Sequence, residues 1–391
     1  MTRRWEIDAL RGLMLVLMTL THLPTRFSDP TGQPFGFVSA AEGFVMLSGY
    51  MAGMVYTRRA RQKGDASIPG AFLRRALKIY LCQAGLLLFL FTLIAMVGLM
   101  ARQEAVTNLL SFYLAHPVQA FVSGMLLIYN PPLLDILPMY ILLMLVSPLV
   151  LLHGLHRGWG GVMGMSLLLW LAAQFDLFHL LYDRMASASR WAWIPFAELG
   201  SFKLFAWQFL WVLGLWMGAS GAEDGPTAGW DFPRWMVNAA LAIAAVMLVW
   251  RHAVGQVPFA EPNALNLLFD KWQLGPMRLI NYCALLVLVM HFGPWLKTRL
   301  PRVAALETLG KASLPVFCTH LLLALVALTI FGSSTPERPV WIDVVILAAT
   351  LGVLYAVAWG SLRIDAQAAE ARKKLAARRI SRRGPGHAPA A

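Results

Sequence analysis

Residues 5–24 read WEIDALRGLMLVLMTLTHLP, an apolar run that carries a polar stripe of Asp8, Arg11 and His22. A helix turns by about 100° per residue, so the eleven-residue step from Arg11 to His22 amounts to three turns and about 20°. Both side chains therefore project from one face, about 16 Å apart along the helix axis. Ionisable groups in a membrane helix usually face a protein interior or a water-filled cavity. This stretch predicts a membrane helix with a polar site along one side.

The composition of the whole chain also indicates a membrane protein. Of the 391 residues 58% are hydrophobic and 14% are charged, and the mean hydropathy is +0.61, which excludes a soluble domain with a single core. An apolar run must cross about 30 Å of hydrocarbon to count as a span. Runs of that length are found at 7–25, 37–56, 77–100, 136–153, 161–179, 202–219, 235–251, 278–296, 313–332 and 341–361. The sequence therefore predicts an all-α polytopic membrane protein with about ten transmembrane helices.

Two further segments complete the predicted organisation. Segment 107–130 is apolar but carries His116 and Pro117, so we expect an interfacial or re-entrant piece. An integral membrane domain then covers 1–361, and 362–391 forms a basic tail that is predicted to be cytoplasmic and disordered.

The basic residues predict the orientation of the chain. With the N-terminus inside and an even number of spans, 24 of the 33 Lys and Arg fall on the cytoplasmic side, as the positive-inside rule expects. Both termini are therefore predicted to be cytoplasmic. Anionic membrane lipids then explain the net charge of +13, and no nucleic acid is needed as a partner.

His22 is a candidate general base, because imidazole transfers protons near neutral pH. The structural alternative is a histidine that donates to a neighbouring carbonyl, beside an Arg11 that extends to lipid head groups. Glu42, at the start of the next helix, either caps that helix or orients His22. Gly49 and Gly53 have the spacing that lets two helices approach closely.

A basic loop at 58–78 follows this helix. Arg74, Arg75 and Lys78 recur there at helical spacing, which suits binding of the phosphates of a cytosolic nucleotide-bearing donor. Basic inner loops also arise from topology alone.

Six motifs carry a family resemblance. They are DALRG with THLP in 5–24, EGFVMLSGYMAGMVY at 42–56, FLRRALKIY at 72–80, DILPMYILLMLVSPLVL at 135–151, FKLFAWQFLWVLGLWMG at 202–218 and LGKASLPVFCTHLLL at 309–323. Together they make the chain resemble the OpgC family of membrane acyltransferases over about 5–361. That family is related to the broader acyltransferase-3 group.

The resemblance implies an O-acyltransferase of the bacterial inner membrane. Its donor would be cytosolic acyl-CoA, with succinyl-CoA expected, and its acceptor the hydroxyls of a periplasmic glucan or related glycan. Acyl-CoA acts as a co-substrate, and neither a metal nor a permanently bound cofactor is implied. Membrane lipids and other glucan-biosynthesis proteins are the remaining expected partners.

The resemblance also implies roles for single residues. Arg11 and His22 match the essential pair of the family, and His22 would activate the sugar hydroxyl. Glu42 is a third catalytic candidate because of its position at the start of the next helix, not because of the resemblance. The Arg-x-x-Arg element of the broader group falls on Arg75 and Lys78, so a lysine without the bidentate fork replaces the second arginine. The candidate substrate-binding residues are Asp8, Asp135, Gln208 and His320, of which His320 matches a recurrent family histidine.

Two questions stay open at this point. A succinyl group would bring a carboxylate into the protein, and Arg11, Arg184 and Arg190 are candidate partners for it. A transporter or flippase is the alternative function, in which Arg11 and His22 bind or relay protons for a substrate that crosses unmodified. Only the acyltransferase needs the loop at 58–78 as a donor site.

Overall fold

The computed structural model describes residues 4–188, 194–223, 231–334 and 338–382, and every regular element within these ranges is helical. This confirms the all-α prediction. The first half of the chain forms α1 (Trp5–His22), α2 (Ser28–Gly32), α3 (Ala40–Lys63), α4 (Ser67–Phe89), α5 (Ala95–Met100), α6 (Glu104–Leu109), α7 (Ser111–Ala115), α8 (Pro117–Met125), α9 (Ile136–Arg157), α10 (Trp159–Gln174) and α11 (Leu177–Ala188). The second half forms α12 (Leu204–Glu223), α13 (Arg234–Val254), α14 (Pro276–Arg299), α15 (Ala304–Lys311), α16 (Ser313–Phe331) and α17 (Val340–Arg382).

Within the described ranges, seven helical stretches are long and apolar enough to cross a membrane, or eight if α10 and α11, bent by 71°, form one span. The seven are 67–100, 136–157, 196–222, 234–254, 276–299, 313–331 and 340–375. The predicted count of ten is therefore not confirmed. With α10 and α11 taken as one span, the two predicted spans that do not meet this criterion are α1 and α3. Helix α1 carries Glu6, Asp8 and Arg11 within 18 residues, and α3 is rich in glycine and ends in basic residues. These two helices hold the predicted catalytic residues.

Glycines bring α3 and α12 into backbone contact. A Cβ atom on Gly49 or Gly53 would overlap the α12 backbone at Trp211 or Leu215. The contact is reciprocal, because a Cβ on Gly214 or Gly218 of α12 would overlap the α3 backbone at Met46 or Tyr50. The packing role predicted for Gly49 and Gly53 is confirmed, and it fixes α3 in the centre of the bundle.

Helix α1 is held in the same way by α15. A Cβ on Gly12 would overlap the Leu306 carbonyl, and a Cβ on Gly310 would overlap the carbonyl of Asp8. On another face, α1 packs against α3 and α16. Among the ionisable side chains of α1, Asp8 is buried between these helices, whereas Glu6 is partly exposed and bonds to Lys297.

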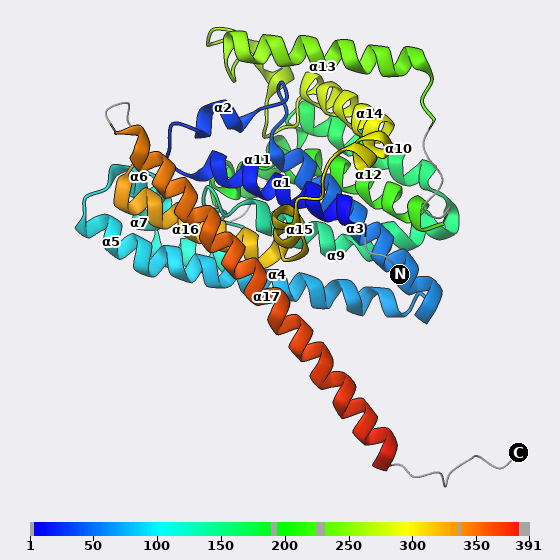
Figure 1. Ribbon diagram of the computed structural model, residues 1–391. Coiled ribbons are helices and arrows are strands. Elements are labelled where there is room, and N and C mark those ends of the chain that lie inside the picture. Colours follow the sequence, from blue (N-terminus) through cyan, green and yellow to red (C-terminus); the bar gives the residue numbers. More distant parts are fainter. Residues whose placement is uncertain (1–3, 189–193, 224–230, 335–337, 383–391) are drawn as a thin grey trace, which may run out of the picture.

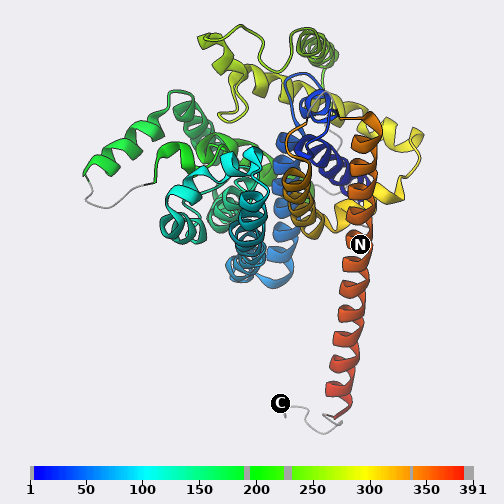
Figure 2. The ribbon, with the colours of Figure 1, turned by 90° about the vertical axis from the view of Figure 1, so that its left-hand side faces the viewer.

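The remaining segments differ from simple spans. Segment 107–130 is broken into α6, α7 and α8, and Pro117 occupies the first turn of α8, where a missing N–H is tolerated. It is therefore not a single membrane helix, in agreement with the sequence. The predicted boundary at 361 falls inside α17, which continues as a helix to Arg382 and extends well beyond the bundle (Figure 1 and Figure 2). Residues 383–391 of the predicted tail lie outside the described ranges.

Candidate functional site

His22 and His320 form a pair between α1 and α16. The Nδ1 atom of His22 lies 3.0 Å from Nε2 of His320, and the two rings stack with centroids 5.3 Å apart. His320 is fully buried, whereas His22 is half-buried. Arg11 contacts the same helix, since its guanidinium donates to the Ser313 hydroxyl. The predicted shared face of Arg11 and His22 is thus confirmed, and that face lies against α16.

His22 opens onto a cavity of about 220 Å³, which we call the His22 cavity. Its polar wall is formed by Thr21, His22, Ser39, Asp135, Ser201 and Lys271. Phe202, Trp272 and Phe317 supply aromatic surface. A cavity that combines a histidine, other polar groups and aromatic rings suits a polyhydroxylated ligand.

Asp135 and Lys271 both precede helical spans and lie in the wall of this cavity. Burial raises the pKa of the Asp135 carboxyl, although a hydrogen bond of 2.9 Å from the Ser201 N–H opposes the rise. Burial likewise lowers the pKa of the Lys271 amine. Burial is the largest cause of both pKa shifts, and the opposite charges of Lys271 and Asp135 oppose them.

Arg11 lines a second and much smaller cavity of about 20 Å³, here called the Arg11 cavity. Arg75 of α4 lies in its wall together with the hydroxyl groups of Ser48, Tyr140 and Ser313. Arg74 and Lys78 are exposed one turn or less from Arg75 along α4. The structure therefore brings one of the three predicted donor-binding residues next to Arg11 and leaves the other two on the surface nearby.

Phe317 lines both cavities. Its ring stacks on Phe44 at a centroid distance of 5.6 Å and meets His320 edge-on at 4.8 Å. The side chain of Phe317 is therefore the partition between the arginine end and the histidine end of the site.

Glu42 contacts an arginine that the sequence analysis did not select. Its carboxylate accepts from Nε of Arg278, and both side chains are fully buried. The other carboxylate oxygen accepts from the Ser39 N–H at 3.0 Å and from the Ser39 hydroxyl at 2.5 Å, which makes a capping box at the start of α3. The structure shows no hydrogen bond between Glu42 and His22 among the described contacts, and the capping alternative describes this geometry.

Two predicted substrate-binding residues lie away from the lining of both cavities. Asp8 is buried where α1 crosses Gly310 of α15. Gln208 joins α12 to α10, because its amide oxygen accepts from the Ser166 hydroxyl and its amide nitrogen donates to the Ser166 carbonyl, each at 2.7 Å. A direct role in substrate binding stays a prediction for both residues.

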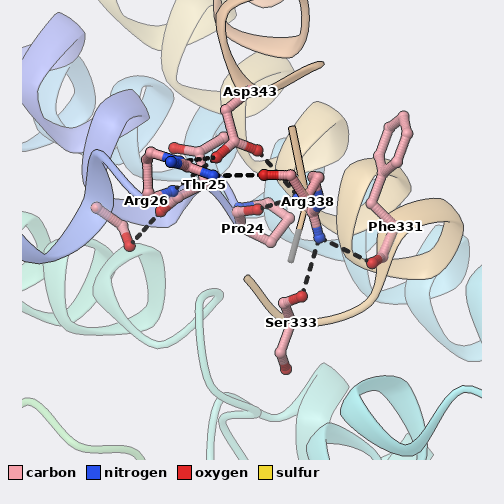
Figure 3. Close-up of polar contacts among 8 residues, drawn as sticks. Pro24, Thr25, Arg26, Phe331, Ser333, Arg338 and Asp343 are labelled. Atoms are coloured by element: carbon pink, nitrogen blue, oxygen red, sulfur yellow. Dashed lines mark hydrogen bonds and ion pairs between the residues drawn. The ribbon is translucent and has the colours of Figure 1, made fainter. Parts of the chain in front are cut away.

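A polar cluster fastens the C-terminal ends of α1 and α16 to each other (Figure 3). The buried carboxylate of Asp343 pairs with Arg26 at 3.2 Å and with Arg338 at 3.3 Å. Arg338 also donates to the carbonyls of Pro24, at 2.6 Å, and Phe331, at 3.0 Å. The cluster therefore joins the chain just after His22 to the C-terminal end of α16, the helix that carries His320 eleven residues earlier.

Sequence reasoning missed several residues of this region, among them Lys271, Trp272, Arg278 and Asp343. Arg278 and Asp343 carried the same signal as Arg11, an ionisable side chain within an apolar run. Lys271 and Trp272 lie in a connecting loop, where no periodicity shows which way a side chain points. No group of three His, Cys, Asp or Glu side chains in the described ranges converges as metal ligands would.

Comparison with protein families identifies the chain. A family model described as OpgC protein matches residues 3–366, nearly the whole length. Searches of curated proteins and of solved structures gave no match. The chain, with its helical bundle and its paired histidines, belongs to the OpgC family.

Proposed function

We propose that this protein transfers an acyl group, succinyl in the first instance, from cytosolic acyl-CoA to hydroxyl groups of a periplasmic glucan or related glycan. It would do so as a multi-pass protein of the bacterial inner membrane. Family membership supports a glucan-modifying transferase. The observation that carries the chemistry is the His22–His320 pair, which lies in the wall of a cavity large enough for part of a sugar ring.

His22 acts as the general base in this proposal. When His22 Nδ1–H donates to Nε2 of His320, the other ring nitrogen, Nε2, is left to accept a proton. His320 then fixes the tautomer of His22 and stabilises the imidazolium that forms. A base placed in this way contributes about 10² to 10⁴-fold to a rate.

The transfer itself is a direct attack. The sugar oxygen forms a bond to the thioester carbon as His22 removes the hydroxyl proton, and the carbon–sulfur bond then breaks. His22 returns the proton to the departing thiolate, so the products are a sugar ester and free CoA. No covalent acyl-enzyme intermediate is needed.

The donor is bound at the other end of the site. Arg75 lies in the Arg11 cavity, and the exposed Arg74 and Lys78 beside it extend the positive charge towards the surface. Cations in this arrangement suit the phosphates of CoA. The acyl chain would then reach His22 past Phe317, which forms the partition between the two cavities.

The purified full-length protein in lipid nanodiscs tests this proposal directly. Succinyl-CoA and a neutral glucan are supplied, and the release of free CoA and the mass of the glucan are followed together. We expect both signals from wild type and from the control His153→Ala, whose histidine is exposed on α9, and neither signal from His22→Ala. If folded wild type gives neither signal in nanodiscs, but moves unmodified glucan across the membrane of sealed proteoliposomes, the transporter alternative is favoured instead.

A further inference from the structure

Lys271 places a positive charge in the wall of the cavity where the proposed chemistry occurs. It lies in the loop between the 3₁₀ helix Ala264–Phe269 and α14. The loop shares the His22 cavity with His22 itself. The proposed reaction so far gives this lysine no task.

The loop that carries Lys271 is held by three hydrogen bonds from α10 and α12. The donors are tryptophan or glutamine side chains and the acceptors are consecutive carbonyls of the loop. They run from Trp207 to Trp272 at 3.0 Å, from Gln174 to Gln273 at 2.7 Å, and from Trp170 to Leu274 at 3.0 Å. Hydrogen bonds to three successive carbonyls restrict the backbone of the loop. The backbone that carries Lys271 is therefore held in place before a ligand binds.

The carboxylates of Glu42 and Asp135 attract the Lys271 ammonium electrostatically, but neither makes an ion pair with it, because each bonds to other groups. Glu42 is paired with Arg278 and Ser39, and Asp135 accepts from the Ser201 N–H. Among the described residues no carboxylate lies within ion-pair distance of the Lys271 amine. The amine lies over the ring of Trp272, 4.6 Å from its centroid. A half-buried ammonium in this setting suits an anionic ligand.

The substrates of the proposed reaction offer one such anion at this end. A glucan acceptor is neutral, and the CoA phosphates would stay with Arg75 on the other side of Phe317. The far end of a dicarboxylic acyl group points away from CoA, so it enters the His22 cavity first. The earlier candidates for this carboxylate are placed elsewhere. Arg11 lines the Arg11 cavity, and Arg184 is exposed on α11. Arg190 lies outside the described residues.

We infer that Lys271 binds the terminal carboxylate of the transferred acyl group and selects a dicarboxylic acyl donor over a neutral one. The inference rests on the proposed function. It makes Lys271 a specificity residue: the carboxylate contact holds the acyl chain extended across the cavity, with its thioester carbon near His22.

Competition between two donors tests the inference. Succinyl-CoA and its amide analogue, succinamoyl-CoA, have nearly the same size and differ in the terminal charge. We expect wild type to prefer succinyl-CoA in kcat/KM by roughly 10- to 100-fold, the range for a hydrogen bond to a charged group. Lys271→Met and Lys271→Gln should bring the ratio close to one, whereas Lys271→Arg should keep most of the preference.

Lys203→Met is the matched control. Lys203 is a half-buried lysine whose amine lies over the Phe196 ring at 4.1 Å, outside the lining of the His22 cavity, so the variant should keep the wild-type ratio. The inference is overturned if wild type does not distinguish the two donors, or if folded Met or Gln variants keep the preference. If wild type transfers neither group, the proposed function fails instead.

Discussion

Two polar pairs lie inside the bundle, and they differ in what surrounds them. Glu42 and Arg278 are sealed from solvent and bonded to each other, whereas His22 faces a cavity beside its buried partner His320. Both pairs join residues more than 200 positions apart in the chain. In a sealed ion pair each charge depends on the other for compensation, while a pair with one open side remains available to a ligand. Burial alone therefore does not identify a catalytic residue in this protein.

The largest effect is expected for the histidine pair. His22→Ala should reduce transfer by about 10² to 10⁴-fold without lowering the amount of protein in the membrane. If the two histidines act as one unit, the His22→Ala/His320→Ala double variant should lose little more than His22→Ala alone. Initial rates of CoA release measure this, and additive losses in the double variant would show that the histidines act independently.

The sealed pair should respond in the opposite way. Glu42→Ala leaves the charge of Arg278 buried without its partner, which is expected to destabilise the protein by about 3–5 kcal/mol. Thermal unfolding in detergent and the yield from membranes measure this loss. The double variant Glu42→Leu/Arg278→Met, which removes both charges, should recover much of the stability. A folded Glu42→Ala protein with no activity would instead favour the predicted catalytic role of Glu42.

The glycine contact between α3 and α12 positions both pairs indirectly. Gly53→Ala should push the two helices apart and destabilise the protein by about 1–3 kcal/mol, because the new methyl group meets the α12 backbone at Leu215. Gly85→Ala in α4 is the control, since its Cβ would meet nothing within 4 Å. Equal unfolding temperatures for the two variants would contradict the close contact.

The smallest effect is expected at the Asp343 cluster. Asp343→Asn keeps the shape of the side chain but weakens its bonds to Arg26 and Arg338, at an expected loss of about 0.5–1.5 kcal/mol. This cluster restrains the C-terminal ends of α1 and α16, the helices that carry His22 and His320. The rate of transfer should therefore fall several-fold even at temperatures where the variant stays folded. Comparing the unfolding temperature with the rate checks this, and a fall in stability with an unchanged rate would limit the cluster to a role in folding.

The sequence predicted the helical class, the shared face of Arg11 and His22, and the packing glycines, because each depends on spacing within one helix. It did not predict contacts between distant segments. The pairing of Glu42 with Arg278 depends on how α3 packs against α14. The position of Lys271 depends on how the loop just before α14 packs against the bundle. The count of ten spans is not confirmed for a related reason: α1 and α3 carry charged residues, some of them covered by other helices, so hydropathy alone does not report whether these two helices cross the membrane.

We expect His22 to catalyse acyl transfer to a glycan. Mass spectrometry of periplasmic glucans, from a strain that lacks the gene and carries either wild type or His22→Ala, tests it most directly. The account predicts an added acyl mass with wild type alone, at equal amounts of the two proteins in the membrane. The same acyl mass in the His22→Ala strain, or its persistence in the strain without the gene, would contradict it.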